Sequence, residues 1–97
     1  MTNVTCIQNK DNLTIVDFYG QWCAPCNAME PVLNEISNEN SNVDFVKVDT
    51  GECFDLATNF EITSIPTFVA VENGKELGRI IGQCSKEDFE KWIKQFN

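Results

Sequence analysis

The sequence predicts an α/β fold built around a mixed β-sheet, and three observations indicate it. Stretches with a strand-like pattern alternate with stretches of helical period along the first part of the chain. The first strong strand-like stretch is mostly apolar, as is typical of a strand that is covered on both faces. Further on, an Asn-Gly pair separates two strand-like stretches and predicts an antiparallel hairpin. Because a strand–helix–strand start implies a parallel crossover, the added hairpin makes the sheet mixed.

The first two expected elements are a buried strand and a long helix. Leu13–Tyr19 reads Leu-Thr-Ile-Val-Asp-Phe-Tyr and predicts a strand that ends at Gly20. A helix is expected from Ala24 to about Asn38, and Pro31 inside it predicts a kink because proline removes a hydrogen bond. The apolar side chains of this helix fall on one stripe, made of Ala28, Met29, Val32, Leu33 and Ile36.

The remaining elements are a second strand, a short helix, the hairpin and a last helix. Their expected ranges are, in order, Val43–Asp49, about Cys53–Phe60, Thr67–Val71, Glu76–Ile81 and a helix that begins at Ser85. Asp88 stands three residues after Ser85, an arrangement similar to a capping box. The side chains expected to face the core are Leu56, Ala57 and Phe60 in the short helix, and Phe89, Trp92, Ile93 and Phe96 in the last one.

The composition excludes several classes of function. The 97 residues predict a single domain, residues 1–97. Fifteen Asp and Glu against seven Lys and Arg give a net charge of −8, which repels the phosphates of nucleic acids. The absence of His excludes catalytic units that need an imidazole. No apolar run approaches the ~20 residues that cross a bilayer. The first residues show no signal-peptide pattern, so we expect a cytoplasmic protein that does not bind membranes.

The five cysteines, at positions 6, 23, 26, 53 and 84, are an odd number and cannot all pair within the chain. In a reducing compartment this number predicts free thiols beside one functional pair, not a disulfide framework. A structural zinc site would need a second closely spaced pair of Cys or His residues, which the sequence lacks. We therefore expect no metal.

The functional pair lies in Trp22-Cys23-Ala24-Pro25-Cys26, where the first strong strand turns into the first long helix. A cysteine at a helix N-terminus meets unpaired backbone N–H groups and the positive end of the helix dipole, which stabilise a thiolate. Two intervening residues let the two sulfur atoms meet with little movement of the backbone. We expect Cys23, the more exposed residue, to be the nucleophile and Cys26 to be the resolving thiol.

The stretch from Val16 to Cys26 closely resembles the active-site segment of thioredoxins. Ile65-Pro66-Thr67-Phe68 is similar to the cis-proline segment of that family, Asn73-Gly74 to its hairpin, and Gly82 to the glycine after its last strand. The resemblance covers residues from about 13 to 97 in matching order and spacing. It implies a thioredoxin fold and the reduction of disulfides in other proteins.

The resemblance also implies roles for residues around the cysteine pair. Asp17 matches the buried acid that exchanges a proton with the resolving thiol, and burial is expected to raise its pKa. Lys47 matches the lysine whose charge lies near that acid. The bond before Pro66 is expected to be cis, which would place the backbone of Ile65 where an incoming peptide can pair with it. An apolar patch around the nucleophile would bind the target, formed by Trp22, Ala24, Pro25, Ile65, Pro66 and Gly82.

The sequence departs from the family pattern in three places. Ala24 replaces the commoner glycine between the cysteines. About twelve residues precede Leu13, which leaves room for a strand around Val4–Ile7 but not for a full helix between Gln8 and Asn12. We therefore expect a central sheet of four to five strands with the first helix shortened or absent. The extra cysteines are the third departure: Cys53 and Cys84 are candidates for regulatory thiols, whereas Cys6 is expected to be structural.

The expected function is a thiol–disulfide oxidoreductase that acts as a monomer on disulfides of target proteins. No cofactor is expected on the chain, because it has no Gly-rich phosphate loop. Electrons would come from NADPH through a flavin-containing thioredoxin reductase. A secretory oxidase or isomerase and a glutathione-dependent glutaredoxin are weaker alternatives, the first because a signal pattern is lacking and the second because Trp22 and the context of Pro66 argue against it. A binding module that uses the fold as a scaffold is a third alternative.

Overall fold

The computed structural model describes residues 2–3 and 12–97. The bounds of the helices and strands are, in chain order, β1 Thr2–Asn3, β2 Thr14–Tyr19, α1 Ala24–Glu39, β3 Asp44–Asp49, α2 Phe54–Asn59, β4 Thr67–Glu72, β5 Lys75–Ile81 and α3 Lys86–Lys94. Every expected element from β2 onward is confirmed, with ends that differ by one or two residues. The expected strand at 4–7 and the shortened or absent first helix fall on residues 4–11, which lie outside the described residues.

The sheet is mixed, as the sequence predicts, with the strand order β1-β3-β2-β4-β5. β3 pairs in parallel with both β1 and β2, whereas β4 runs antiparallel to β2 and to β5. β2 is therefore the central strand. Its register places Asp17 directly opposite Lys47 on β3 and opposite Phe68 on β4.

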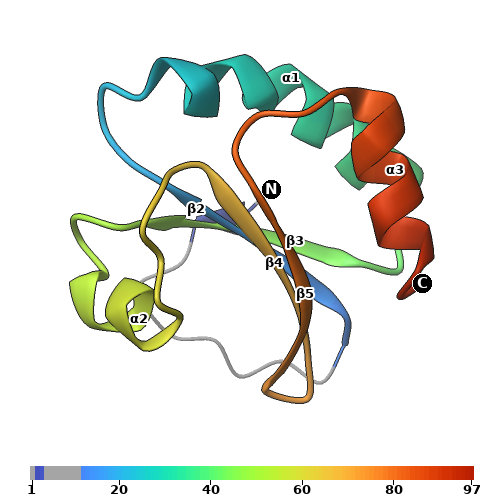
Figure 1. Cartoon of the computed structure of the whole chain (residues 1–97). Helices are drawn as coiled ribbons and strands as arrows, with labels where there is room; N and C mark the ends of the chain where they lie inside the picture. Colours follow the sequence, from blue (N-terminus) through green and yellow to red (C-terminus); the bar gives the residue numbers. More distant parts are fainter. Residues whose placement is uncertain (1, 4–11) are drawn as a thin grey trace.

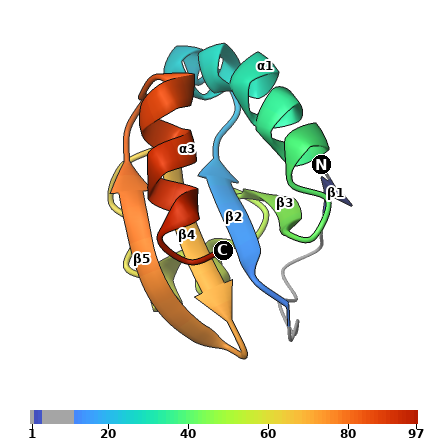
Figure 2. The ribbon, with the colours of Figure 1, turned by 90° about the vertical axis from the view of Figure 1, so that its right-hand side faces the viewer.

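Helices cover both faces of the sheet. Figure 1 shows α1 and α3 together on one face and α2 on the other, and in Figure 2 β2 is seen between α3 and α1. Side chains of a strand alternate between the two faces. Ile15 of β2 accordingly packs in the core cluster beneath α1 and α3, whereas Val16 and Phe18 pack in the cluster beneath α2. By the same alternation, Asp17 and Lys47 lie on the α1 face, since Phe45 of β3 also belongs to the α1 cluster.

The buried stripe of α1 differs from the predicted one at its N-terminal end. The buried side chains of the helix are Cys26, Met29, Leu33 and Ile36, with Val32 half-buried at the edge. Ala28 was expected on this stripe but is exposed. The reason is geometric, because residues three and four apart share a helix face, and the stripe that continues from Cys26 leaves Ala28 outside it. This position of the stripe turns the second cysteine of the pair toward the core.

The hairpin and the last helix form as the sequence predicts. Asn73 and Gly74 have φ angles of 54° and 77°, the left-handed conformation that a two-residue turn between antiparallel strands requires. Ser85 is the N-cap of α3, and its Oγ accepts a hydrogen bond from the Asp88 N–H at 3.1 Å. The Phe89 ring packs edge-on against Phe68 with the ring centroids 5.1 Å apart. None of the described helices is long and apolar enough to cross a lipid bilayer.

Candidate active site

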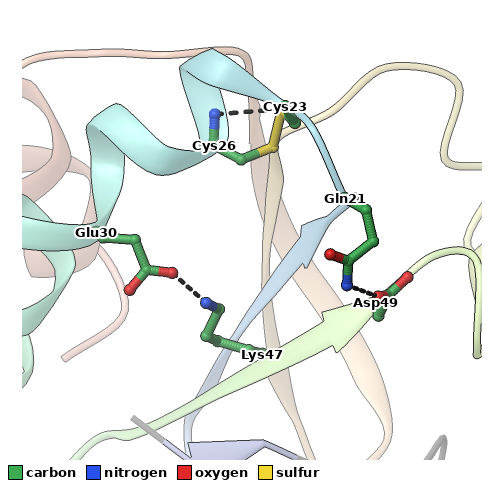
Figure 3. A network of polar contacts seen from close by, with 6 residues as sticks. All are labelled: Gln21, Cys23, Cys26, Glu30, Lys47 and Asp49. Atoms are coloured by element: carbon green, nitrogen blue, oxygen red, sulfur yellow. Dashed lines mark hydrogen bonds and ion pairs between the residues drawn. A yellow bond between two sulfur atoms is a disulfide. The ribbon is translucent and has the colours of Figure 1, made fainter.

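The site forms in the turn between β2 and α1. Cys23 is the N-cap of α1, and its Sγ accepts a hydrogen bond from the Cys26 N–H at 3.2 Å (Figure 3). The two residues are joined by a disulfide with their Cα atoms 5.2 Å apart, so the pairing expected from their spacing is confirmed. The first turn of the helix thus presents the Cys26 N–H and the positive end of the helix dipole to the sulfur of Cys23. This arrangement favours a negative charge on that sulfur when the disulfide opens.

The two cysteines differ in their access to solvent. Cys23 is half-buried at the surface, whereas Cys26 belongs to the buried face of α1 and is 5% exposed. Trp22, just before the pair, is fully exposed and has a left-handed backbone with φ of 60°, which is uncommon for a residue other than glycine. An incoming molecule therefore meets the indole of Trp22 and the sulfur of Cys23, and does not reach Cys26.

The expected cis-proline segment lies beside this turn. The Ile65–Pro66 bond is cis, as predicted. A methyl group on Gly20, the residue that follows β2, would lie 2.7 Å from Ile65 Cδ1, so the absence of a side chain there lets the two segments meet. The Gly82 N–H donates to the Pro66 carbonyl at 2.8 Å, which fastens the start of β4 to the end of β5.

The six residues expected to bind a target differ in exposure. Trp22, Ala24 and Pro25 are exposed, Ile65 and Gly82 are half-buried, and Pro66 is buried. A further apolar side chain that sequence reasoning missed, Ile81 at the end of β5, is 61% exposed next to Gly82. The signal available in the sequence was the pair Ile80-Ile81, because neighbouring residues of a strand point to opposite faces of the sheet.

Asp17 is buried in the middle of β2 with 3% of its surface exposed. Its Oδ1 accepts no hydrogen bond from any residue that the structure describes. Burial raises the pKa of its carboxyl to about 7, while the positive charge of Lys47 acts to lower it and the negative charge of Glu30 acts to raise it. The expected elevation of this pKa is therefore found, and its cause is desolvation.

Lys47 lies opposite Asp17 in the register, but its ammonium pairs with another acid. Its Nζ forms an ion pair with Oε1 of Glu30 on α1 (Figure 3) and lies 4.4 Å from the centroid of the Tyr19 ring. Sequence reasoning missed Glu30. The available signal was its position four residues after Cys26, because residues four apart lie on the same face of a helix.

A second polar contact that sequence reasoning missed ties the turn to β3. Gln21 Nε2 donates to Asp49 Oδ2 at 2.8 Å (Figure 3), and Asp49 Oδ1 accepts from the Gly51 N–H at 2.7 Å. The hydrogen bond from Gln21 and those from the backbone of Gly51 and Glu52 outweigh desolvation and hold the pKa of Asp49 below its usual value. The active-site turn is thereby anchored to the end of the neighbouring strand.

The remaining cysteines occupy different environments. Cys53 is 3% exposed before α2 and is disulfide-bonded, so the expectation of a free thiol is wrong for this residue. Cys84 is a free thiol, half-buried against the α1 and α3 core cluster. Burial, and secondarily the charge of Asp88, raise the pKa of the Cys84 thiol, which disfavours its reactive form. Cys6 lies outside the described residues.

Together, these features define a class of protein. A mixed sheet carries, at the end of its central strand, a disulfide-bonded pair of cysteines with one accessible and one buried member, beside a cis-proline. Such an arrangement suits reversible exchange of disulfides. The thioredoxin family model matches residues 3–95, and the chain belongs to the thioredoxin family.

The relatives of this chain agree with that family. It is 42% identical over 89 residues to thioredoxin H2 of Arabidopsis thaliana. The aligned residues make up 92% of this chain and 66% of the relative. The chain thus spans less than two thirds of the length of that relative. Among solved structures, the crystal structure of thioredoxin NaTrxh from Nicotiana alata has a TM-score of 0.82 at 42% identity, covering 89% of this chain and 74% of that one.

A further solved structure covers nearly the whole chain. It concerns the thiol-resolving mechanism in yeast mitochondrial 1-Cys peroxiredoxin via glutathione and thioredoxin systems. Its TM-score is 0.89 at 33% identity, covering 99% of this chain and 95% of that one. The fold found here is therefore that of known thioredoxin-type structures.

Proposed function

We propose that this protein is a thiol–disulfide oxidoreductase that reduces disulfides in target proteins. The observation that carries the proposal is the accessible sulfur of Cys23 at a helix N-terminus, bonded to the buried sulfur of Cys26. Membership of the thioredoxin family supports the same activity. The disulfide form described above corresponds to the product of one such reaction.

The reaction takes place in two exchange steps. The Cys23 thiolate attacks one sulfur of the target disulfide, forms a mixed disulfide and releases the other target sulfur as a thiolate. The Cys26 thiolate then attacks Cys23 Sγ, forms the Cys23–Cys26 disulfide and releases the second target sulfur. The target gains two electrons and the pair loses two. Solvent supplies the two protons that convert the released thiolates into thiols.

Asp17 is proposed to accept the proton that Cys26 loses before the second step. A carboxyl group whose pKa lies at about 7 can both take and give a proton near neutral pH. Asp17 and Cys26 are both buried on the side of the sheet that α1 covers, which supports this role. Lys47 is proposed to moderate the charge that Asp17 carries when it is ionised.

The target is proposed to dock on the surface around Cys23. Trp22, Ala24 and Pro25 supply exposed contacts on one side of the sulfur, with Ile65, Pro66 and Gly82 on the segments near the ends of β4 and β5. The yeast structure concerned with a peroxiredoxin and a thioredoxin system supports protein disulfides as the substrate class. An extended peptide that pairs with the Ile65 backbone is the expected binding mode.

Regeneration of the dithiol requires an external reductant. We propose that a flavin-containing thioredoxin reductase supplies the electrons from NADPH. We also propose that the protein acts as a monomer, in a reducing compartment such as the cytoplasm. The chain itself would then carry no cofactor. Titration in thiol–disulfide buffers should give a reduction potential typical of reducing thioredoxin-fold proteins. We expect it to lie roughly 100 mV below that of disulfide isomerases. A potential at the oxidising end would favour the secretory alternative instead.

The Cys26→Ser variant tests the activity directly. It keeps the nucleophile but lacks the resolving thiol, so it should retain target proteins as mixed disulfides that a reductant releases. Capture from an oxidised mixture of model disulfide proteins, followed by non-reducing electrophoresis, provides the measurement. Cys84→Ser is the matched control, because it removes a thiol outside the pair and should trap nothing. A Cys26→Ser protein that holds its partners equally well after reduction would instead indicate a scaffold.

A further inference from the structure

The buried acid of this site lies near a lysine whose charge is bound elsewhere. Asp17 and Lys47 face each other across the paired strands, on the side of the sheet that α1 covers. The Lys47 ammonium nevertheless pairs with Glu30 and lies over the ring of Tyr19. Asp17 Oδ1 is left, within the described part of the chain, without a hydrogen bond.

We propose that Glu30 is a positioning residue for Asp17: by binding the Lys47 ammonium, it keeps that charge from forming a direct ion pair with the buried acid. This inference rests on the proposed function, because it concerns the proton that the resolving thiol exchanges. It adds a residue of α1 to the site, one helical turn after Cys26.

Solvation explains why Glu30 rather than Asp17 binds the lysine. The side chains of Lys47 and Glu30 are 19% and 37% exposed, so their ion pair keeps contact with water. An ion pair with Asp17 would draw the ammonium toward a residue that is 3% exposed, where the loss of hydration offsets the attraction. Lys47 lies between two acids, and binding the more exposed one, Glu30, costs less desolvation. Glu30 therefore binds the lysine.

The other groups around Asp17 offer it no second cation. β2 contributes the phenol of Tyr19, β3 contributes Lys47 and, at its end, Asp49, and α1 contributes Glu30 and the disulfide-bonded Cys26. On β4 the residue opposite Asp17 is the apolar Phe68. Among the groups that these described elements bring together, Lys47 is the single positive charge. The position of its ammonium therefore has a direct effect on whether Asp17 is ionised.

The consequence concerns the protonation of Asp17 near neutral pH. Burial raises the pKa of Asp17 to about 7, Lys47 acts against this rise and Glu30 acts with it. If the ammonium moved to Asp17, the ionised form would gain a close opposite charge and the pKa would fall. Asp17 would then remain a carboxylate at neutral pH and would return a proton less readily. Glu30 thus keeps the acid in the range where it can exchange protons.

The Glu30→Gln variant provides the test. It removes the charge that holds Lys47 and keeps a side chain of similar shape on α1. We expect the pKa of Asp17 to fall by about one unit or more, as measured by carbon-13 NMR titration of the Asp17 carboxyl. The midpoint of the pH profile of disulfide reduction should fall with it. A pKa of Asp17 that stays within a few tenths of a unit of the wild-type value would overturn the proposal.

Glu35→Gln is the matched control. Glu35 is also on α1, and its carboxylate pairs with Lys86 of α3, away from the Asp17 site. The substitution removes the same charge from the same helix but leaves the ion pair of Lys47 intact. The pKa of Asp17 should stay at its wild-type value in this variant. An equal fall in both variants would mean that net charge alone moves the pKa, and would contradict a positioning role.

The Lys47→Gln background separates positioning from the direct charge of Glu30. If Glu30 acts by holding the lysine, Glu30→Gln should shift the pKa of Asp17 by less than half as much once Lys47 is absent. An undiminished shift would show that the carboxylate of Glu30 acts on Asp17 by itself, and would overturn the proposal. The NMR titration can be read on protein that reduces no target at all. Failure of the proposed activity is therefore distinguishable from failure of this inference.

Discussion

Asp17 and Asp49 are the same residue type on neighbouring strands, both buried, and yet their pKa values move in opposite directions. They are 3% and 7% exposed. Desolvation raises the pKa of Asp17 to about 7, whereas hydrogen bonds from Gln21 and from the backbone of Gly51 and Glu52 lower the pKa of Asp49. Oδ1 of Asp17 accepts no hydrogen bond from the described residues, while both oxygens of Asp49 accept one or more.

The difference follows from the position of each aspartate in its strand. Asp17 lies in the middle of β2, where β3 and β4 pair with the strand on both sides and take up the surrounding backbone N–H groups. Asp49 is the last residue of β3, and the N–H groups of the turn that follows are free to bind its carboxylate. The centre of a sheet thus yields an acid that can change its charge, and the end of a strand yields one that stays ionised and stabilises the fold.

The two acids should make opposite contributions to the pH dependence of stability. The pKa of Asp17 is higher in the folded than in the unfolded protein, so with respect to this residue the fold is most stable below about pH 4 and loses stability as the pH rises to about 7 and the buried carboxyl ionises. The pKa of Asp49 is lower in the folded protein, so its contribution is complete above the unfolded value of 3.8 and is lost as the pH falls through the folded value.

The largest expected effect comes from Asp17→Asn, which removes the cost of a buried carboxylate. At pH 8 the variant should exceed the wild type in free energy of unfolding by up to about 4 kcal/mol, the equivalent of a rise in pKa from 3.8 to about 7. At pH 4 the two proteins should differ little, because Asp17 is then largely protonated in the folded state. Urea unfolding of the oxidised proteins at both pH values provides the measurement. Parallel stability profiles for the two proteins would contradict the assignment.

A smaller change in stability, in the opposite direction, is expected for Asp49→Ala. This substitution removes the acceptor for Gln21 and for the turn at 50–52. We expect the free energy of unfolding at pH 7 to fall by about 1–3 kcal/mol, because the hydrogen bonds from Gln21 and from the backbone of the turn to a charged acceptor are lost. The same urea experiment at pH 7 measures it. Asp44→Ala, at the other end of β3, is the matched control and should cost less. An equal loss in the two variants would mean that the hydrogen bonds of Asp49 add nothing to stability.

The smallest effect is expected for Gln21→Ala, which sharpens the comparison between the two acids. The exposed amide of Gln21 is the first contributor to the low pKa of Asp49, so that pKa should rise while the pKa of Asp17 stays unchanged. The loss of stability should be about 1 kcal/mol or less, as for a partly exposed hydrogen bond. NMR titration of both carboxyl groups in one sample provides the measurement. A shift of both pKa values together would show that the two sites are not independent.

Much of the site was predictable because it depends on local sequence. The pair of cysteines between a buried strand and a helix follows from spacing and hydrophobic pattern alone, whereas the place of Asp17 in the site was implied by the resemblance to thioredoxins. Asn73 and Gly74 specify their turn through the backbone conformations they tolerate. The ion-pair partner of Lys47 could not be predicted from the sequence. The sequence places Asp17 in the neighbouring strand but gives no position for the helix that carries Glu30.

The sequence by itself determined the order of helices and strands, the mixed sheet and the cysteine pair that forms the disulfide, since these rest on periodicity and spacing along the chain. Only the tertiary structure decided which acid binds Lys47, that Gln21 reaches Asp49, and that Trp22 is fully exposed. Each of these depends on how separate elements pack and on how much water remains at their contacts. Desolvation and side-chain pairing are properties of the packed arrangement, and they set the pKa values on which the chemistry of the site depends.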